Sequence, residues 1–262
     1  MLSTEENVAV LIEAWKLMVG RLPGAKIHQS GGVATMFGHV ALPFLNLSVL
    51  DRRLADEQDL RSVLAVARER ARSCAHGSML GLCEALAPEN WERGAAEEGF
   101  VPALNMTGMA ADRLLPPRHA PPDLEFRRVL NEAEARDLAT INAHAYGMPL
   151  QQFECICNLY LWREDSFAYV GYAGGQAVAS AAALPVAGAM YIAFVATLPE
   201  AQGKGYAEAV MRKAIQQAQP SIGVTRMTLH ASDMGKPLYR SMGFEPGAKV
   251  PLLGAPDGLS RH

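Results

Sequence analysis

The spacing of apolar residues along the chain is clearest from residue 124 onward. Apolar positions recur there at helical spacing over 132–146 and over 207–218. Pro220 is expected to end the second of these helices, because proline interrupts the backbone hydrogen bonds of a helix. The same pattern predicts strands at 124–131, 167–173, 176–184, 189–197, 226–232 and 249–255, and short helices at 150–162 and 236–243.

The first 115 residues show a fainter version of the same order. "EEGF", ending at Phe100, takes the place that "SMGF", ending at Phe244, takes in the second half, which indicates a duplication. The pattern predicts helices over 6–19, 56–75 and 89–99, and strands over 34–42, 44–50, 78–86 and 102–110.

A proline-rich segment separates the two halves. "LPPRHAPPD", residues 115–123, holds four prolines, which remove backbone donors and disfavour helix in the residues before them. We therefore predict a first domain over 1–115, a linker over 116–122 and a second domain over 123–262. At 262 residues the chain is long enough for two domains that each bury a core.

Residues 166–199 carry no charged side chain, and a stretch of this length could span a bilayer. However, much of its apolar content is alanine, and turns are expected at Gly174–Gly175 and at 185–188. The stretch is therefore predicted to form three buried strands, with a membrane span as the disfavoured alternative.

Composition adds limits on the class of protein. Hydrophobic residues make up 50% of the chain, as in globular proteins, and the net charge of −3 gives no reason to expect nucleic acid or an anionic membrane as partner. The acidic N-terminal segment lacks the features of a signal peptide. Four cysteines, at 74, 83, 155 and 157, lack the spacing of metal ligands. We expect buried, reduced thiols in a cytoplasmic protein without a metal.

A glycine turn, "EAQGKGYAEAVM" over 200–211, leads from an apolar strand into a helix. The start of a helix exposes unpaired N–H groups and a partial positive charge, and glycine lets phosphate oxygens approach them. The turn is not a Walker loop, and Glu208 stands where the dinucleotide motif has its third glycine. It predicts a phosphate-bearing ligand, with a plain strand-to-helix connection as the alternative.

A second segment, "LHASDMGKPLYRSMGFE" over 229–245, places Tyr239 two residues after Pro237, at the expected start of a helix. Gly243 suits a left-handed residue that ends this helix, and Phe244 is then expected to fold back into the core. Taken alone, Tyr239 is either a core tyrosine with a satisfied hydroxyl or a functional group.

Together these segments resemble a known family. Q-x-x-G-x-A follows a strand that ends in V-A-T-x-P, and L-x-A-S and L-Y-x-x-x-G-F come later in the chain. The set resembles the GNAT acyl-CoA-dependent N-acetyltransferases over residues 124–250, and the first half resembles the degenerate GNAT-like domain of two-domain members. The resemblance implies an α/β (α+β) fold with two GNAT-like domains, each a mixed, mostly antiparallel sheet flanked by helices.

The resemblance implies transfer of an acetyl group from acetyl-CoA, as cosubstrate, to a primary amine by direct attack. Main-chain amides near Phe194 and Val195 are expected to face the thioester, with Val195 stabilising the oxyanion. Tyr239 matches the family's usual general acid for the CoA thiolate. The implied coenzyme-binding residues are Phe194, Val195, Ala196, Thr197, Gln202, Gly203, Lys204, Gly205, Tyr206, Ala207, Ser232 and Tyr239.

No residue stands out as the general base. Glu154, or a chain of water molecules, is a candidate to take the proton from the amine. His230 is either a packed strand histidine or a side chain that faces the substrate channel. Ser232 either touches the coenzyme or caps the turn that follows it.

The first domain is expected to bind no CoA. Its long helix is preceded by no glycine, and Asp56, Glu57 and Asp59 at the start of that helix would repel a pyrophosphate. No tyrosine occurs in the first 145 residues, so this domain has no counterpart of Tyr239.

Two functions stay open from the sequence. The favoured one is a cytoplasmic acetyltransferase with a small-molecule or peptide amine as acceptor. The alternative is a non-catalytic acyl-CoA sensor or regulatory module, which would have no need of a proton donor such as Tyr239. A homodimer is possible, and neither nucleic acid nor a membrane is expected as partner.

Overall fold

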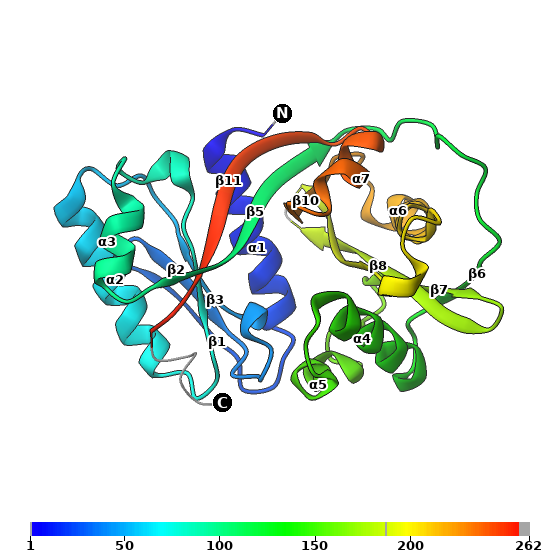
Figure 1. The fold of residues 1–262 in the computed structure, drawn as a ribbon, viewed down its shortest axis with the longest axis horizontal. Helices are drawn as coiled ribbons and strands as arrows, with labels where there is room; N and C mark the ends of the chain where they lie inside the picture. The colour runs from blue at the N-terminus through cyan, green and yellow to red at the C-terminus, as the bar shows by residue number, and fades with distance from the viewer. Residues whose placement is uncertain (1, 187, 257–262) are drawn as a thin grey trace. The chain divides into compact units, whose positions relative to one another are not determined.

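The computed structural model of the protein describes residues 2–186 and 188–256. The chain packs into two compact units, and strands β5 (Val101–Ala111) and β10 (Met227–Ser232) each run from one unit into the other (Figure 1). Of the described residues, the first unit comprises 2–109, 230–236 and 245–256, and the second comprises 110–186, 188–229 and 237–244.

The first unit is built on a mixed sheet with the strand order β1-β2-β3-β4-β11. Only β3 and β4 pair in parallel, and the other neighbours are antiparallel. The last strand of the chain, β11, therefore pairs with β4 of the first unit, although the sequence-based division places it in the second domain. The strands are β1 (Lys26–Ser30), β2 (Val33–Phe37), β3 (Asn46–Leu50), β4 (Met79–Gly81) and β11 (Glu245–Gly254).

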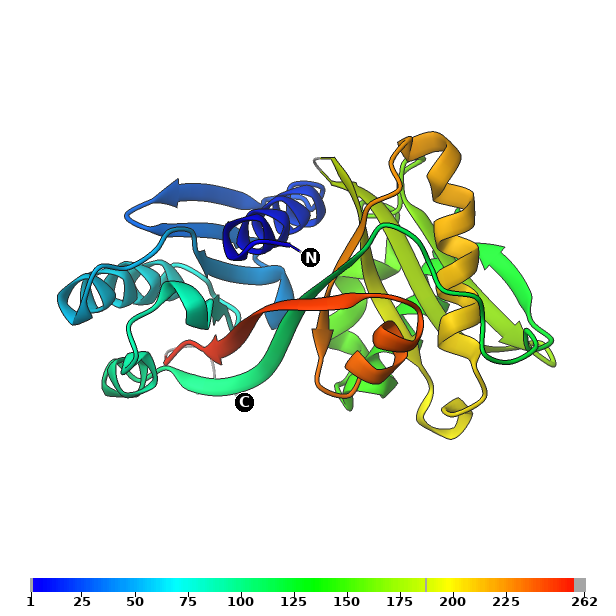
Figure 2. The ribbon, with the colours of Figure 1, turned by 90° about the horizontal axis from the view of Figure 1, so that it is seen from above.

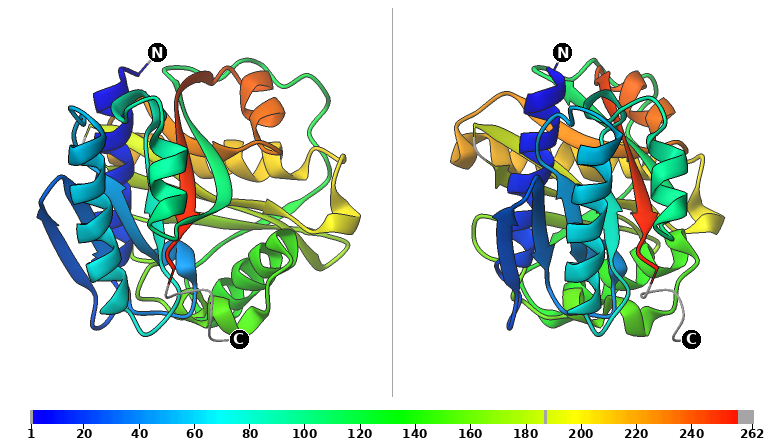
Figure 3. Two further views of the ribbon diagram at one scale, coloured as in Figure 1. Left: turned by 60° about the vertical axis from the view of Figure 1, so that its left-hand side comes forward. Right: turned by 90° about the vertical axis from the view of Figure 1, so that its left-hand side faces the viewer.

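Helices cover both faces of this sheet. Every residue of β2 and β3 is buried, which requires cover on each side. Helix α1 lies on one face, and α2 and α3 stand side by side on the other (Figure 3). The helices are α1 (Thr4–Val19), α2 (Glu57–Arg72) and α3 (Trp91–Glu97).

The second unit has the strand order β10-β9-β8-β7-β6, in which only β9 and β10 are parallel. Helix α6 packs on β7, β8 and β9 from one face, and α4 packs on them from the other (Figure 2). Both units thus have the predicted mixed, mostly antiparallel sheet flanked by helices. The remaining elements are β6 (Glu125–Arg128), β7 (Phe167–Ala173), β8 (Gln176–Val186), β9 (Ala189–Thr197), α4 (Glu132–Tyr146), α5 (Glu154–Cys157), α6 (Tyr206–Ile222) and α7 (Lys236–Ser241).

The end of α6 corrects one prediction. The helix continues past Pro220 to Ile222 and ends at Gly223, which has a φ of 71° and donates its N–H to the carbonyl of Gln219. Pro220 lies on the exposed side, where water can bind the carbonyl that loses its partner. The left-handed glycine therefore ends this helix, as it ends α4 at Gly147.

Other differences concern short or exposed elements. Strand β1 was missed because all five of its residues are exposed and show no apolar pattern. The predicted helix over 150–162 is only a 3₁₀ turn, Leu150–Phe153, followed by the four residues of α5. The strand predicted over 78–86 is limited to the three residues of β4.

The uncharged stretch 166–199 forms β7, β8 and β9, as predicted. Gly174 and Gly175 make the first turn with positive φ angles. Among the helices in the described part of the chain, none has the length and apolar character needed to cross a bilayer.

Candidate functional site

Strand β9 carries a bulge at the predicted oxyanion position. Ser180 of β8 pairs with Ala196, whereas Ala182 pairs with Ala193, so Phe194 and Val195 face a single residue of β8. Phe194 has a φ of 52°, which a residue with a side chain adopts only where surrounding contacts hold it. The bulge thus turns the main chain at the two residues expected to face the thioester.

Two buried polar side chains hold this bulge. The hydroxyl of Ser180 donates to the carbonyl oxygen of Phe194 over 2.8 Å, and Asn142 Nδ2 donates to Ser180 Oγ over 3.0 Å. Neither side chain exceeds 1% exposure. The Phe194 ring also packs edge-on against Trp162, with centroids 5.2 Å apart. Asn142 is a polar residue on the otherwise apolar buried face of α4, and this was the signal available in the sequence.

The edge of β9 toward β10 is only partly paired. The parallel register covers Met190 with Met227 and Tyr191 with Thr228. From Ile192 to Thr197, β9 has no pairing with β10 in the described structure. Main-chain groups along this edge, including those of Ala196 and Thr197, are therefore not used in pairing with β10.

The glycine turn follows at the end of β9. Gly203 and Gly205 have φ angles of 76° and 77°, and a Cβ added to either would meet no atom within 4 Å. The described residues provide no acceptor for the backbone N–H groups from Gly203 to Glu208. The hydrogen bonds of α6 begin one residue later, with the N–H of Ala209 donating to the carbonyl of Gly205. Six successive donors, among them those of Lys204, Tyr206 and Ala207, thus lie at the positive end of α6.

Polar side chains frame this turn. Gln202 and Lys204 are exposed. Glu208, in the first turn of α6, would oppose an anion, but Arg212 pairs with it at 2.7 Å. Arg212 also donates to the carbonyl of Leu115 over 2.7 Å. The Arg212 guanidinium therefore offsets the charge of this carboxylate beside the backbone donors of the turn.

Tyr239 lies on α7 and is 8% exposed. Burial raises its pKa above the ordinary value, and the neighbouring Tyr146 raises it further, so the phenol keeps its proton at neutral pH. Within the described residues no hydrogen bond engages the hydroxyl. Gly243, with a φ of 100°, ends the helix, and Phe244 is buried, as predicted.

Helix α4 brings Tyr239 and the bulge to the same region. Asn142 and Tyr146 are four residues apart and so are neighbours on one side of the helix. Asn142 supports the bulge through Ser180, and Tyr146 lies close to Tyr239. Two of the predicted features therefore converge at the C-terminal half of α4.

The other candidates lie in more ordinary settings. His230 is partly buried and shares a 3.1 Å hydrogen bond with Asn7, and burial lowers its pKa to about 3. This setting fits the packed strand histidine. Ser232 accepts from the N–H of Gly235 over 3.3 Å, as a turn cap does. Glu154 is exposed at the start of α5 and stays a candidate base.

The four cysteines are free thiols, and three of them are buried. Cys155 is half-buried, and burial raises the pKa of its thiol to about 12. Thiols with raised pKa values stay protonated and are poor nucleophiles at neutral pH. Within residues 2–186 and 188–256, no three side chains of His, Cys, Asp or Glu gather as metal ligands would.

A comparison with protein families finds a match within the second half of the chain. The family model described as "Acetyltransferase (GNAT) family" matches residues 134–244. Residues 134–244 are a GNAT domain. The bulge on β9, the glycine turn, α6 and Tyr239 all lie within this GNAT domain. None of the curated proteins compared with the chain matches it.

Solved structures share the fold along almost the whole chain. A GCN5-related N-acetyltransferase from Kribbella flavida superimposes with a TM-score of 0.68 at 22% identity, covering 95% of this chain and 96% of its own. One from Sphaerobacter thermophilus gives 0.59 at 14% identity, covering 95% and 91%. A tandem GNAT protein from the clavulanic acid biosynthesis pathway gives 0.54 at 14% identity, covering 99% and 98%. The likeness thus extends beyond the GNAT domain to the first unit, which supports the predicted tandem arrangement.

Proposed function

We propose that the protein is an N-acyltransferase that moves an acetyl group from acetyl-CoA to a primary amine. One arrangement carries the proposal. Within a GNAT domain, a bulge held by buried side chains is followed along the chain by a turn with six unpaired N–H groups. These features suit a ligand that has a carbonyl at one end and a pyrophosphate further along.

The residues present fit acetyl-CoA. The N–H groups from Gly203 to Ala207 would hold the pyrophosphate, with Gln202 and Lys204 beside it, and the open edge of β9 would bind the pantetheine arm. Ser232 is proposed as a further contact of that arm. When bound, acetyl-CoA supplies a thioester whose acetyl group passes to the amine. The N–H of Val195 would donate to the thioester carbonyl oxygen as charge develops there.

Tyr239 is proposed as the general acid. The new C–N bond forms as the C–S bond breaks, and the phenol donates to the departing sulfur while the amine nitrogen loses a proton to Glu154 or to water. A free thiol has a pKa of about 8.5, well below that of Tyr239. Burial also raises the pKa of a thiol bound at this position, so the difference between the pKa values of the thiol and of Tyr239 becomes smaller inside the site.

The first unit is proposed not to bind CoA. Asp56 caps α2 by accepting from the N–H of Asp59 over 2.9 Å, and Asp59 makes two 2.6 Å hydrogen bonds with Arg52. The start of this helix is thus occupied by the chain's own carboxylates. Residues 123–262, apart from the segments that pack in the first unit, are accordingly proposed as the catalytic domain, and 1–115 as a domain without a CoA loop. The free thiols fit a reducing compartment such as the cytoplasm.

The test is release of free CoA from acetyl-CoA with a panel of small amines and peptide N-termini. Amine-dependent release supports the enzyme, and the amine that gives the highest kcat/KM identifies the acceptor class. Tight binding of acetyl-CoA without turnover by any amine would replace the enzyme with an acyl-CoA sensor. Absence of binding would remove both.

A further inference from the structure

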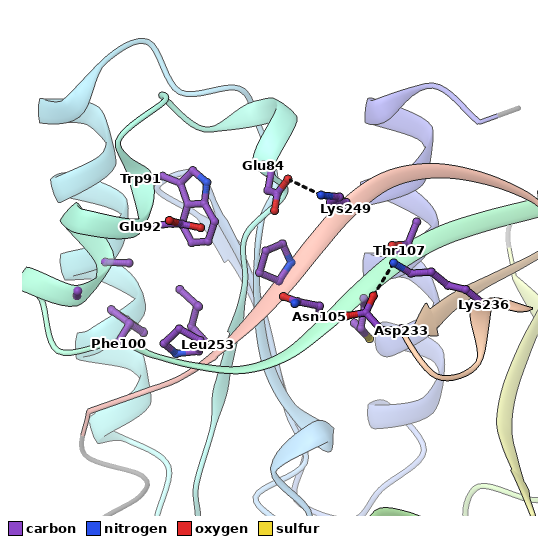
Figure 4. Close-up of a pocket in the computed structure, with 15 residues that line it drawn as sticks. Glu84, Trp91, Glu92, Phe100, Asn105, Thr107, Asp233, Lys236, Lys249 and Leu253 are labelled. Atoms are coloured by element: carbon purple, nitrogen blue, oxygen red, sulfur yellow. Dashed lines mark ion pairs between the residues drawn. The ribbon is translucent and has the colours of Figure 1, made fainter.

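A cavity of about 570 Å³ lies within the first unit (Figure 4). Its volume falls in the range of about 300–1,000 Å³ that is usual for small-molecule sites. One wall is a face of β11, on which Lys249, Pro251 and Leu253 alternate with core residues. Helix α3 supplies another wall with Trp91 and its neighbours. None of the lining residues belongs to the second unit.

One end of the cavity is apolar and aromatic. Trp91, Phe100 and Leu253 are 9%, 3% and 2% exposed, and they gather there (Figure 4). The indole N–H of Trp91 has no hydrogen-bond partner among the described residues, whereas those of Trp15 and Trp162 donate to backbone carbonyls over 2.6 and 2.8 Å. The indole nitrogen of Trp91 is not among the buried polar atoms that lack a partner, so water reaches it. An acceptor group of an aromatic ligand could take the place of that water.

The charged side chains around the cavity form two ion pairs, and one further carboxylate lines it. Lys249 pairs with Glu84 at 4.0 Å, and Lys236 pairs with Asp233 at 2.6 Å, as the dashed lines in Figure 4 mark. Glu92, which also lines the cavity, has no ion-pair partner in the described part of the chain. The lining therefore carries one uncompensated negative charge, close in sequence to Trp91.

We propose that this cavity binds a small organic cation, a primary ammonium group on an aromatic body. The ammonium would pair with Glu92, and the ring would pack against Trp91 and Phe100, where aromatic faces also attract the positive charge. The proposal does not depend on acetyl transfer, because it uses no residue of the catalytic machinery proposed for the second unit.

Three probes of similar shape and different charge test this proposal: phenethylamine, 2-phenylethanol and phenylacetate. Titration into the whole chain at pH 7, followed by calorimetry and tryptophan fluorescence, should show one site for phenethylamine and much weaker binding of the other two. Glu92→Gln should weaken the amine about ten-fold, the usual scale of a hydrogen bond to a charged group. Trp91→Phe should also weaken binding of phenethylamine, measured by calorimetry, because the ammonium and the ring lose part of the indole surface.

Two controls make the assignment specific. Glu97→Gln changes an exposed carboxylate on α3 that pairs with Arg93 and does not line the cavity, so amine binding should not change. Gly205→Asp alters the proposed CoA turn and should also leave it unchanged. Equal affinity for the alcohol or the anion, full amine affinity in Glu92→Gln, or no binding at millimolar amine would each overturn the proposal. The proposal would also be overturned if Gly205→Asp lost amine binding while Glu92→Gln kept it.

Discussion

The hydroxyl of Ser180 donates to the carbonyl oxygen of Phe194 over 2.8 Å and thereby fixes a backbone conformation with a φ of 52°. Such a conformation costs a residue with a side chain about 1–3 kcal/mol and persists only where neighbouring contacts hold it. Asn142 completes the support by donating to Ser180. The geometry of the proposed thioester site therefore depends on two buried residues that need not touch the ligand themselves.

Replacement of Ser180 by alanine is expected to lower kcat by about ten-fold or more. The substitution leaves the Phe194 carbonyl and one amide hydrogen of Asn142 without partners, so the bulge loses its support and the Val195 N–H shifts. Steady-state kinetics with varied acetyl-CoA check this, with a smaller change expected in KM because the glycine turn is intact.

Ser180→Thr and Ser62→Ala serve as the matched variants. Threonine keeps a hydroxyl and should restore much of kcat. Ser62 is exposed on α2, and among the described residues its hydroxyl bonds only to the Gln58 carbonyl, so Ser62→Ala should leave kcat unchanged. If Ser180→Ala had full kcat, or if it lost activity only in proportion to its stability, the positioning role would be wrong.

Tyr239→Phe is expected to lower kcat by about 100-fold while acetyl-CoA affinity stays nearly constant, which is the usual scale for loss of a general acid. The ring and its edge-on contact with Phe244 are retained, so folding should be preserved. Tyr160→Phe, at an exposed tyrosine, is the control. Unchanged kcat in Tyr239→Phe would exclude the phenol from the mechanism.

Much of the second unit could be predicted because its elements have clear periods and clear ends. The strands of 166–199 are apolar on both faces, and Asn131 and Gly147 cap α4 in the usual way. Strand β1 could not be found in this way, because an exposed edge strand such as "KIHQS" needs no apolar residues. Its pairing with β2 depends on tertiary structure that no local pattern encodes.

In the candidate site, too, contiguous features could be predicted from the sequence, and contacts between distant elements could not. The glycine turn and Tyr239 are contiguous motifs, so they were visible in the sequence. The support of the bulge joins Asn142, Ser180 and Phe194 from three elements, and no local spacing connects them. The cavity of the first unit is likewise assembled from β5, α3, β11 and the turn after β10, which explains why it has no sequence signature.

His230 is expected to make the free energy of unfolding depend on pH below neutrality. Its pKa in the folded chain is lowered to about 3, against about 6.5 when unfolded. Between these values only the unfolded chain binds the proton, so the free energy of unfolding should fall as pH decreases from 7 toward 3, by at most about 1.4 kcal/mol per pH unit from this residue. Urea unfolding at pH 7 and pH 5 measures the slope. His230→Asn should flatten it, and His119→Asn, at an exposed position, should not.

Gly205→Asp is expected to abolish acetyl-CoA binding, because it places negative charge among the unpaired N–H groups at the start of α6. Backbone strain accompanies any side chain at a φ of 77°, so two variants separate strain from charge. Gly205→Asn carries the same bulk without the charge and should retain weakened binding, and Gly175→Asp, at a φ of 83° in the open β7–β8 turn, should bind normally. Calorimetric titration with acetyl-CoA distinguishes them. If Gly205→Asp bound as tightly as the original chain, the turn would be only a connection between β9 and α6.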